Sequence, residues 1–438
     1  MGLLNHIAVN TLYRFFFLIL QFLITIFISR LIGPAGLGTY SLILANASAL
    51  LIFTSLGIPA GLTFHAAKKD ISSPSLIKIA FYSATAQFFF IVIIELISWS
   101  ISGKFLIWPV KYPVEGAFGM LFFLSLMITE RYGALYNGHH HLQSYQLQLT
   151  LFSLLTLTPL VYWTVSDNQL AESSVIITMI LVSLLQMISL GLVFRRLTVN
   201  NNTELPASEA YALSGFFNYS MLAWFANSIQ FLVYRIDFWI LQYFKGDEEL
   251  GLYALAVRIG QTFWVVPALL STIILPHMTS VTFDQRILER IIRLTNSINL
   301  FLMLIIGLLA NILIPWIFGS AFSGTVTSFL ILIPGILFFS MHTLLASYFA
   351  SKNKINYNLQ TSIFALVSVT ILDFLLIPEK GKTGAAMAST IAYTASSIYA
   401  LMLYVRMEKY SIHRLMIEKQ DINWLRENLS RLVFTNKI

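Results

Sequence analysis

Apolar runs of about twenty residues or more recur along nearly the whole chain, and they set the tightest limit on its fold. A helix needs about 20 apolar residues to cross the hydrocarbon of a bilayer, because every backbone N–H must find its partner within the segment. The runs are continuous and rich in Leu, Ile and Phe, which argues against the short alternating strands of a membrane barrel. We predict an all-α polytopic membrane protein with about twelve transmembrane helices. The predicted spans are 9–32, 38–66, 76–101, 116–137, 146–166, 173–194, 212–244, 250–279, 292–314, 323–350, 357–377 and 383–406.

The amino-acid composition agrees with lipid as the solvent. Hydrophobic residues make up 57% of the chain and charged residues 11%, whereas a soluble domain carries about 25% charged residues. The net charge of +7 is spread over alternate loops and a tail, so we expect no nucleic-acid partner. Cysteine is absent, which excludes a disulfide framework and a thiolate nucleophile. The first apolar run lacks a cleavage site and is expected to remain as a span.

Lysine and arginine are unevenly divided between the two sets of loops. Seventeen lie in one set of alternate loops together with the tail, and six lie in the other set or at its helix ends. Cytoplasmic loops of membrane proteins carry the excess of Lys and Arg. Both termini are therefore predicted to be cytoplasmic.

The sequence repeats itself at a nearly constant offset. Gly36–Leu42 resembles Glu249–Leu255 at an offset of 213, and Ser144–Leu147 resembles Asn356–Leu359 at an offset of 212. Six spans in each half bring the second half into the membrane on the same side, so the repeat is parallel, with its axis along the membrane normal. We expect a central cavity between the halves. The predicted domains are a six-helix half over 1–197, a cytoplasmic linker over 198–211, a second six-helix half over 212–406 and a cytoplasmic amphipathic tail over 407–438 on the anionic leaflet.

Three motifs resemble those of a known transporter family. They are Leu31–Tyr40, the set Asp237, Ile240, Leu241, Gly251, Tyr253 and Ala256, and Lys382–Ala388. They are similar to the polysaccharide-biosynthesis flippases of the multidrug/oligosaccharidyl-lipid/polysaccharide exporter superfamily, and the resemblance covers essentially the whole chain. It implies a multi-pass protein of the bacterial inner membrane that moves an undecaprenyl-diphosphate-linked oligosaccharide from the inner to the outer leaflet by alternating access. The product would be O-antigen, capsule or exopolysaccharide. Partners would be the lipid-linked oligosaccharide, membrane lipids, a polysaccharide polymerase and other assembly proteins.

Two arginines lie at matching distances from a short polar turn, Lys245–Glu249. Arg235 precedes Gly246 by eleven residues, and Arg258 follows it by twelve. In antiparallel helices both guanidinium groups would lie at about the same depth, since each residue climbs about 1.5 Å. An arginine cannot lose its proton, so it must face protein, water or an anion, and its geometry suits phosphate oxygens. We predict that both bind the diphosphate. Pairing with Asp237 or with another helix is the structural alternative.

Arg14, near the end of the first span, is a third candidate for the anionic substrate, at the entry to the cavity. A side chain so close to a helix end can also reach the interface without any ligand.

Four carboxylates inside spans are candidates for ion coupling. They are Asp237, which we rank first, and Glu95, Glu130 and Asp373. A carboxylate in a medium of low dielectric could carry a proton or hold sodium. Structural pairing is the alternative for each, and Glu130 directly precedes Arg131. No other cofactor is expected. We predict no metal site, because the run His139–His141 lacks Cys or carboxylate partners.

Three rival functions remain open at this point. A multidrug exporter of the same fold would need carboxylates facing an apolar pocket for cationic drugs. A membrane glycosyltransferase or polymerase would need a large extracytoplasmic loop with catalytic residues, and the longest here is Ser102–Gly116. A passive scaffold would not need arginines in the membrane. We predict a transporter, with no catalytic residues.

Overall fold

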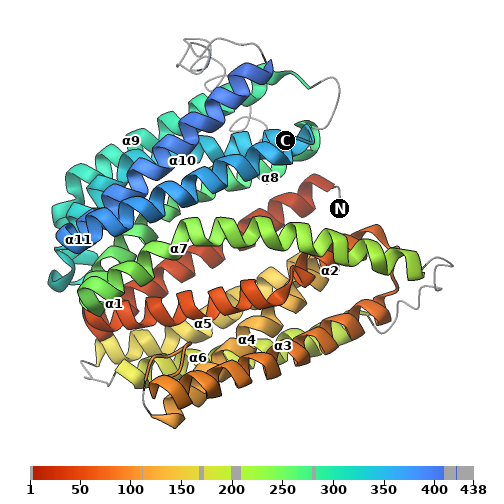
Figure 1. Ribbon diagram of the computed structural model, residues 1–438, viewed down its shortest axis with the longest axis horizontal. Helices are drawn as coiled ribbons and strands as arrows, with labels where there is room; N and C mark the ends of the chain where they lie inside the picture. The colour runs from red at the N-terminus through yellow and green to blue at the C-terminus, as the bar shows by residue number, and fades with distance from the viewer. Residues whose placement is uncertain are drawn as a thin grey trace, which may run out of the picture. The chain divides into compact units, whose positions relative to one another are not determined.

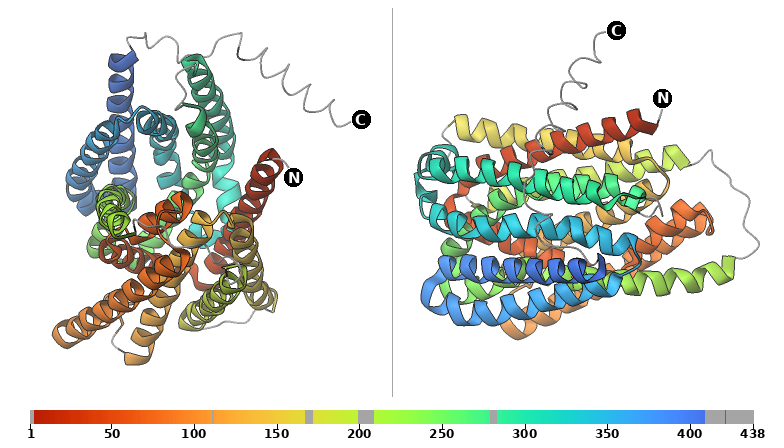
Figure 2. Two further views of the ribbon diagram at one scale, coloured as in Figure 1. Left: turned by 90° about the vertical axis from the view of Figure 1, so that its right-hand side faces the viewer. Right: turned by 90° about the horizontal axis from the view of Figure 1, so that it is seen from above.

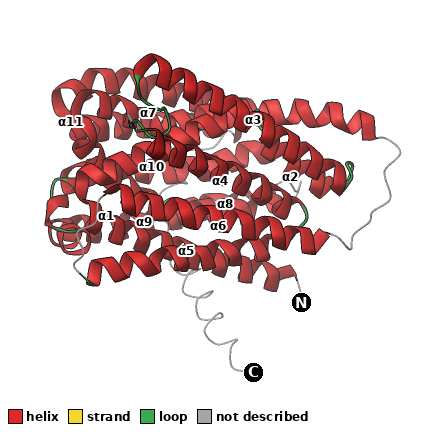
Figure 3. Cartoon of the chain, turned by 90° about the horizontal axis from the view of Figure 1, so that it is seen from below, coloured by secondary structure: helices red, strands yellow, loops and turns green. Residues whose placement is uncertain are grey.

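In the computed structural model, the described residues are 3–110, 112–166, 172–198, 209–278, 283–408 and 421. These residues form α-helices and one 3₁₀ turn, and no strand occurs among them (Figure 3). The prediction of an all-α protein is confirmed. The elements are α1 (Leu3–Ser55), α2 (Ile58–Lys68), α3 (Ser73–Ser102), α4 (Pro113–Gly138), α5 (Leu142–Val165), α6 (Glu172–Thr198), α7 (Glu209–Thr262), α8 (Val265–Met278), α9 (Gln285–Phe318), η1 (Ser320–Phe322), α10 (Thr325–Ser351) and α11 (Ile355–Glu408).

Within the described residues, eight helices are long and apolar enough to cross a membrane. A ninth is added when α7 and α8, bent by 42° at a short break, are counted as one span. Their outer faces carry many exposed Leu, Ile and Phe side chains, as expected for helices that face lipid. The chain is a multi-pass membrane protein.

Three helices contain a glycine with non-helical backbone. Helices α1, α7 and α11 have 53, 54 and 54 residues, and the glycines are Gly33 (φ 66°, ψ −173°), Gly246 (φ 82°, ψ −174°) and Gly381 (φ 56°, ψ −135°). At about 1.5 Å per residue each helix would extend about 80 Å if straight, far more than the about 30 Å of a bilayer core. Positive φ is accessible to glycine without strain. Each glycine divides its helix into a first arm before it and a second arm after it. In Figure 1, the first arm of α1 runs away from the N-terminus, and the second arm returns beside α7.

The helices group into two compact units, 1–251 with 317–322, and 252–316 with 323–438. In the first unit one apolar core joins α1, α3, α4 and α6 around Ile43, Phe123 and Ile176, and another lies around Leu62 and Phe216. In the second unit α10 packs along α11 (Figure 2), and a core of α8, α9, α10 and α11 surrounds Leu344 and Tyr348.

The break between α7 and α8 has an identifiable cause. Pro267 has no N–H to donate to the carbonyl of Phe263, four residues earlier. That carbonyl accepts a hydrogen bond from the Asn299 side-chain amide of α9, at 3.3 Å. The Trp264 indole next to the break donates to the carbonyl of Ile336 on α10, at 3.1 Å. Neighbouring helices thus satisfy the backbone groups that the proline leaves open.

One loop geometry occurs twice in the chain, at the larger offset of the sequence repeat. His140 and Asn353 both adopt left-handed backbone, with φ of 61° and 56°. The backbone hydrogen bonds around them match in pairs at the same offset. They are His139 N to Leu135 O (3.0 Å) and Lys352 N to Tyr348 O (3.1 Å), His140 N to Asn137 O (3.1 Å) and Asn353 N to Ala350 O (3.1 Å), and His141 N to Tyr136 O (2.8 Å) and Lys354 N to Phe349 O (2.8 Å). Gly33 and Gly246 have the same separation and nearly equal backbone angles.

Candidate functional site

Helix α7 packs against α1, and against the turn between α1 and α2, in very close contact within the first unit. A Cβ on Gly38 would lie 1.8 Å from the carbonyl oxygen of Asp247, and a Cβ on Gly57 would lie 1.9 Å from that of Ser220. Backbone therefore meets backbone at both ends of this contact. Because no side chain fits between the helices there, α7 is fixed in height and direction against α1.

Indole groups join the same helices between those two glycines. Trp239 donates to the Asn46 side-chain oxygen at 2.7 Å, and Trp224 donates to the carbonyl of Phe53 at 3.2 Å. The Phe53 carbonyl lies just before the end of α1, where the N–H of Gly57 bonds to the Ser55 hydroxyl instead. These bonds fix the rotation of α7, and with it the positions of Arg235 and Asp237.

Arg235 lies on this held segment of α7 and is partly buried. Its guanidinium carbon is 4.7 Å from the centroid of the Phe238 ring, and Nη1 donates to the carbonyl of Tyr234 at 3.4 Å. Within the described residues no carboxylate forms an ion pair with Arg235. The structural alternative, pairing with Asp237, is thus not observed for Arg235.

The other two predicted arginines are placed differently. Arg258 is partly buried on the arm of α7 that follows Gly246 and belongs to the second unit, whereas Arg235 belongs to the first. The break at Gly246 falls in the predicted polar turn between them. Arg14 lies on α1 and is exposed. Arg235 and Asp237 thus lie on the same segment of α7 in the first unit, and Arg258 lies in the second unit.

The four candidate carboxylates differ in their surroundings. Asp237 in the first unit and Asp373 in the second are 1% and 0% exposed. Glu95 is 0% exposed and accepts hydrogen bonds from the backbone N–H groups of Leu106 and Ile107, at 2.7 and 2.9 Å. Those bonds hold the loop between α3 and α4, which gives Glu95 a structural task. Glu130 is partly buried on α4.

Arg131, which the sequence analysis names only as the neighbour of Glu130, is itself a buried polar residue. Arg131 is 3% exposed, and its Nη2 donates to the Gln87 side-chain oxygen on α3 at 2.7 Å. The available signal was the adjacent Glu130–Arg131 pair in an otherwise apolar run. The run alone does not show that Arg131 points inward.

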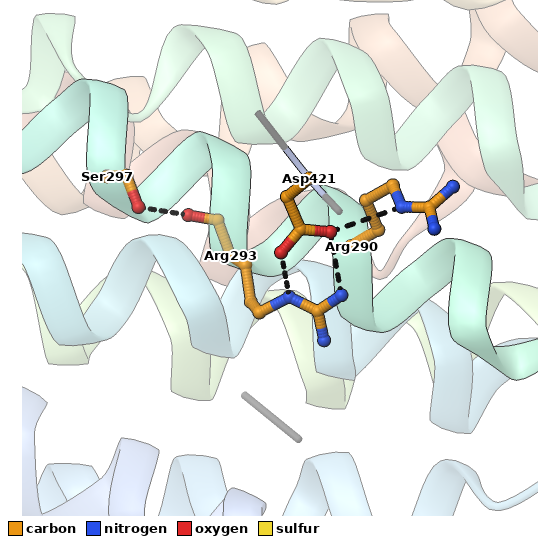
Figure 4. A network of polar contacts seen from close by, with 4 residues as sticks. All are labelled: Arg290, Arg293, Ser297 and Asp421. Carbon is orange, nitrogen blue, oxygen red and sulfur yellow. Dashed lines mark hydrogen bonds and ion pairs between the residues drawn. The ribbon is translucent and has the colours of Figure 1, made fainter. Parts of the chain in front are cut away.

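A buried ion pair joins the tail to α9 in the second unit (Figure 4). Arg293 donates to both carboxylate oxygens of Asp421, at 2.6 and 2.8 Å, and Arg290 donates to one of them at 3.2 Å. Asp421 is fully buried, so the chain is anchored here thirteen residues after α11 ends. The rest of the predicted tail, and most of the predicted linker 198–211, lie outside the described residues.

Comparison with known proteins identifies the fold. No protein-family model matches the chain, and no curated protein sequence matches it. The lipid II flippase MurJ in an inward closed conformation has a similar structure, with a TM-score of 0.74, 11% identity, and coverage of 93% of this chain and 89% of that one. A point mutant of the Vibrio cholerae MATE transporter VcmN is also similar, with a TM-score of 0.64 and 12% identity. That similarity covers 94% of this chain and 98% of the transporter.

An inward-facing multidrug-resistance MATE transporter of the MOP superfamily gives a TM-score of 0.64 at 13% identity, covering 90% of this chain and 96% of that one. All three similarities extend over nearly the full length of both partners. At 11–13% identity, these similarities show the fold of the chain. This chain has the membrane-transporter fold that the MurJ flippase and the MATE transporters of the MOP superfamily share.

Proposed function

We propose that the protein is a secondary flippase that moves a diphosphate-linked lipid oligosaccharide from the inner to the outer leaflet by alternating access. The observation that carries the proposal is Arg235, partly buried on a membrane helix, stacked on Phe238 and in no ion pair within the described chain. A fixed positive charge in that setting favours an anionic substrate. The fold shared with a lipid II flippase supports the same class of cargo.

The proposed architecture has twelve crossings in two halves related by a parallel repeat around a cavity. Helices α1, α7 and α11 would each cross the membrane twice, once before and once after the glycine break. These additional crossings bring the number to twelve. The turn geometry that recurs at the offset of the repeat supports the two halves, 1–197 and 212–406. Spatial compactness groups the first arm of α7 with α1–α6 because of its close contact with α1 and α2, whereas the repeat begins its second half with that arm.

The arginines would act on the diphosphate, the part of the substrate that is hardest to move through hydrocarbon. Guanidinium groups bind phosphate oxygens in pairs and replace their hydration. Arg235 and Arg258 would hold the diphosphate in the cavity, and Arg14, exposed on α1, would meet it at entry. Proton or sodium movement through Asp237 or Asp373 would supply the driving force, as in ion-coupled transport generally.

In the cell, the protein would lie in the bacterial inner membrane with both termini cytoplasmic. It would serve surface polysaccharide assembly, as O-antigen, capsule or exopolysaccharide, beside a polymerase and other assembly proteins. Its partners would be lipids and the lipid-linked saccharide, with no nucleic acid.

An ion-coupled multidrug exporter is the second candidate, favoured by the MATE neighbours and by the buried carboxylates Asp237 and Asp373. A cationic drug would be attracted by those carboxylates and repelled by Arg235. The third candidate, a membrane glycosyltransferase or polymerase, draws no support from the neighbours, which are transporters.

The test is accumulation of lipid-linked saccharide in the inner leaflet of cells that lack the protein. Wild type should clear the accumulated lipid, and Arg235→Ala and Arg258→Ala should not. Lys104→Ala, an exposed loop change, serves as the control and should behave as wild type. Full clearance by both arginine variants would remove the site assignment. Drug sensitivity of the deletion without lipid accumulation would favour the multidrug exporter.

A further inference from the structure

A buried polar network crosses three helices of the first unit and is not used by the substrate site described above. Arg131 on α4 donates to Gln87 on α3 at 2.7 Å. The Gln87 amide donates in turn to the carbonyl of Leu51 at 3.2 Å and to the Thr54 hydroxyl at 2.9 Å, both on α1. Gln87 is thereby fixed in orientation, with its oxygen directed at Arg131.

Arg131 in this network and Glu130, its neighbour in sequence, have unused hydrogen-bonding atoms. Arg131 Nε and Nη1, and Glu130 Oε2, are buried and have no hydrogen-bond partner in the described chain. Arg131 and Glu130 attract each other electrostatically. An arginine stays charged in the membrane, and a buried charge with incomplete hydrogen bonding destabilises the fold unless an opposite charge compensates it.

The titratable and charged groups that face Glu130 in the described chain are Arg131 from its own helix and Tyr145 from α5. The Tyr145 hydroxyl lies against Gly133, one turn after Glu130 on α4, where a Cβ would come within 2.7 Å of it. The groups that α1 and α3 contribute to this network are neutral: Thr54, the Leu51 carbonyl and Gln87. Glu130 therefore has one fixed cation and one phenol in its surroundings.

The second unit contains the same scaffold without the charges. Asn299 of α9 donates to the carbonyl of Phe263, and these two residues follow Gln87 and Leu51 at an offset of 212. At the offset of 213 that relates the turns after α4 and α10, Leu344 takes the place of Arg131 and Thr343 the place of Glu130. Leu344 is fully buried in an apolar core, and the Thr343 hydroxyl bonds within its own helix.

This difference between the halves shows whether Glu130 and Arg131 are present for packing or for function. An apolar side chain fills the position well in the second unit, and replacing a buried ion pair by apolar residues is often neutral or stabilising. The fold therefore does not require Glu130 and Arg131. A charged pair kept inside the membrane in one half only is expected to serve transport.

We propose that Glu130 is a proton-binding site of the transport cycle, and that Arg131, held by Gln87, is its fixed counter-charge and positioning residue. The inference rests on the proposed transport function. The ligand is a proton, because the guanidinium beside Glu130 repels a metal cation and the described chain offers no cluster of ligands for one. Uptake forms one O–H bond on the carboxylate and leaves Arg131 as an uncompensated charge. Release restores the neutral pair.

The first arm of the experiment measures protonation directly, by infrared difference spectroscopy of the full-length protein in lipid over a pH series. Wild type should show a carboxylic-acid carbonyl band that titrates, and Glu130→Gln should lose it. Arg131→Leu should move the titration to higher pH, because the compensating charge is gone. Glu95→Gln is the matched control and should keep the band. An unchanged titrating band in Glu130→Gln would overturn the proposal.

The second arm places the residues of the second unit in the first, as Glu130→Thr with Arg131→Leu. This double variant should fold with wild-type thermal stability and should lose the dependence of lipid clearance on the proton gradient, measured as at least a tenfold smaller response to a protonophore. A wild-type protonophore response in the double variant would also overturn the proposal.

A third measurement, binding of polyprenyl diphosphate to purified protein, separates this inference from the proposed function. Wild type and Glu130→Gln should bind equally, and Arg235→Ala should bind about tenfold more weakly or worse. Absence of binding by wild type, together with the titrating Glu130 band, would reject the lipid substrate and leave the proton site standing.

Discussion

Gly38 and Gly251 occupy reciprocal positions in the first unit. A Cβ on Gly38 would lie 1.8 Å from the carbonyl oxygen of Asp247, and a Cβ on Gly251 would lie 1.8 Å from that of Pro34. Each oxygen belongs to the residue four positions before the opposite glycine, and Pro34 and Asp247 are separated by the same offset as the two glycines. A contact in which residue i meets j and j meets i is the mark of a two-fold relation. The arms of α1 and α7 thus cross at their glycine-bearing starts, backbone against backbone.

Substituting either glycine by alanine should destabilise the protein. A methyl group at Gly38 or Gly251 meets a carbonyl oxygen of a neighbouring helix, which cannot move away as a flexible side chain can. Overpacking of this kind costs about 1–3 kcal/mol or more. Thermal unfolding of the purified protein checks the expectation. Gly215→Ala on α7 is the control, since its methyl would lie 3.9 Å from its nearest neighbour. Equal stabilities of all three variants would contradict this account of the crossing.

Arg235→Lys should retain only part of the transport activity that Arg235→Ala loses. Lysine keeps the charge, but it cannot bind two phosphate oxygens in a fork or stack on Phe238 as a flat group. Hydrogen bonds to charged groups contribute about 1.5–3 kcal/mol, so the alanine variant should lose about tenfold or more in affinity for polyprenyl diphosphate. The measurement is equilibrium binding at fixed salt. Equal affinities of the lysine variant and wild type would show that point charge alone suffices.

Asp237→Asn should abolish ion-dependent transport while the protein stays folded. The carboxylate is 1% exposed, and the amide has nearly the same shape but neither a titratable proton nor a charge. The readout is lipid clearance in the presence and absence of an ion gradient. Glu95→Gln is the comparison: it should keep the ion dependence and lose thermal stability, because one of its two bonds to the backbone N–H groups of Leu106 and Ile107 is lost. Wild-type transport by Asp237→Asn would remove Asp237 as the coupling residue.

The anchor of the tail on α9 should depend on Arg293 more than on Arg290. Arg293 is 5% exposed at its side chain and makes two bonds to Asp421, whereas the side chain of Arg290 is 28% exposed and makes one bond, at 3.2 Å. Removing one partner of a buried pair costs about 3–5 kcal/mol. Arg293→Ala and Asp421→Asn should therefore lower the thermal stability, and Arg290→Ala should lower it less. Limited proteolysis of the tail provides an independent measurement, and a larger effect of Arg290→Ala would refute the ranking.

The loop after α2 should lose stability in acid. Burial raises the pKa of the Asp70 carboxyl, but hydrogen bonds and charges from Lys68 and His65 lower the pKa by a larger amount. The net pKa of Asp70 is therefore below the ordinary value of 3.8. A group with a lowered native pKa stabilises the fold above its unfolded pKa, and this contribution is lost as the pH falls through the native value. The difference in thermal stability between wild type and Asp70→Asn should thus be present at neutral pH and vanish in strong acid. A stability difference between the two proteins that grows on acidification would contradict this prediction.

The glycine-centred turn and the polar turn near Gly246 were predictable because they depend on neighbours in sequence. Only glycine takes up the positive φ of Gly33 and Gly246 readily, and the turn at Lys245–Glu249 is charged between apolar runs. The offset of the repeat was also visible in the motifs. The reciprocal contact of Gly38 with Gly251 was not, since it depends on how two distant segments approach.

The sequence by itself determined that this chain is a bundle of membrane-spanning helices with short turns. In lipid, the backbone N–H and C=O groups of each apolar segment must form hydrogen bonds within that segment. Only the tertiary structure decided which polar side chains point inward and which atoms they meet: Arg131 against Gln87, Glu95 against a loop backbone, Arg235 against Phe238. The physical reason is that these helices are apolar on nearly every side. On α3, α4 and α7, which carry these side chains, no amphipathic stripe marks the inner face, and the rotation of each of these helices is set by contacts with distant segments.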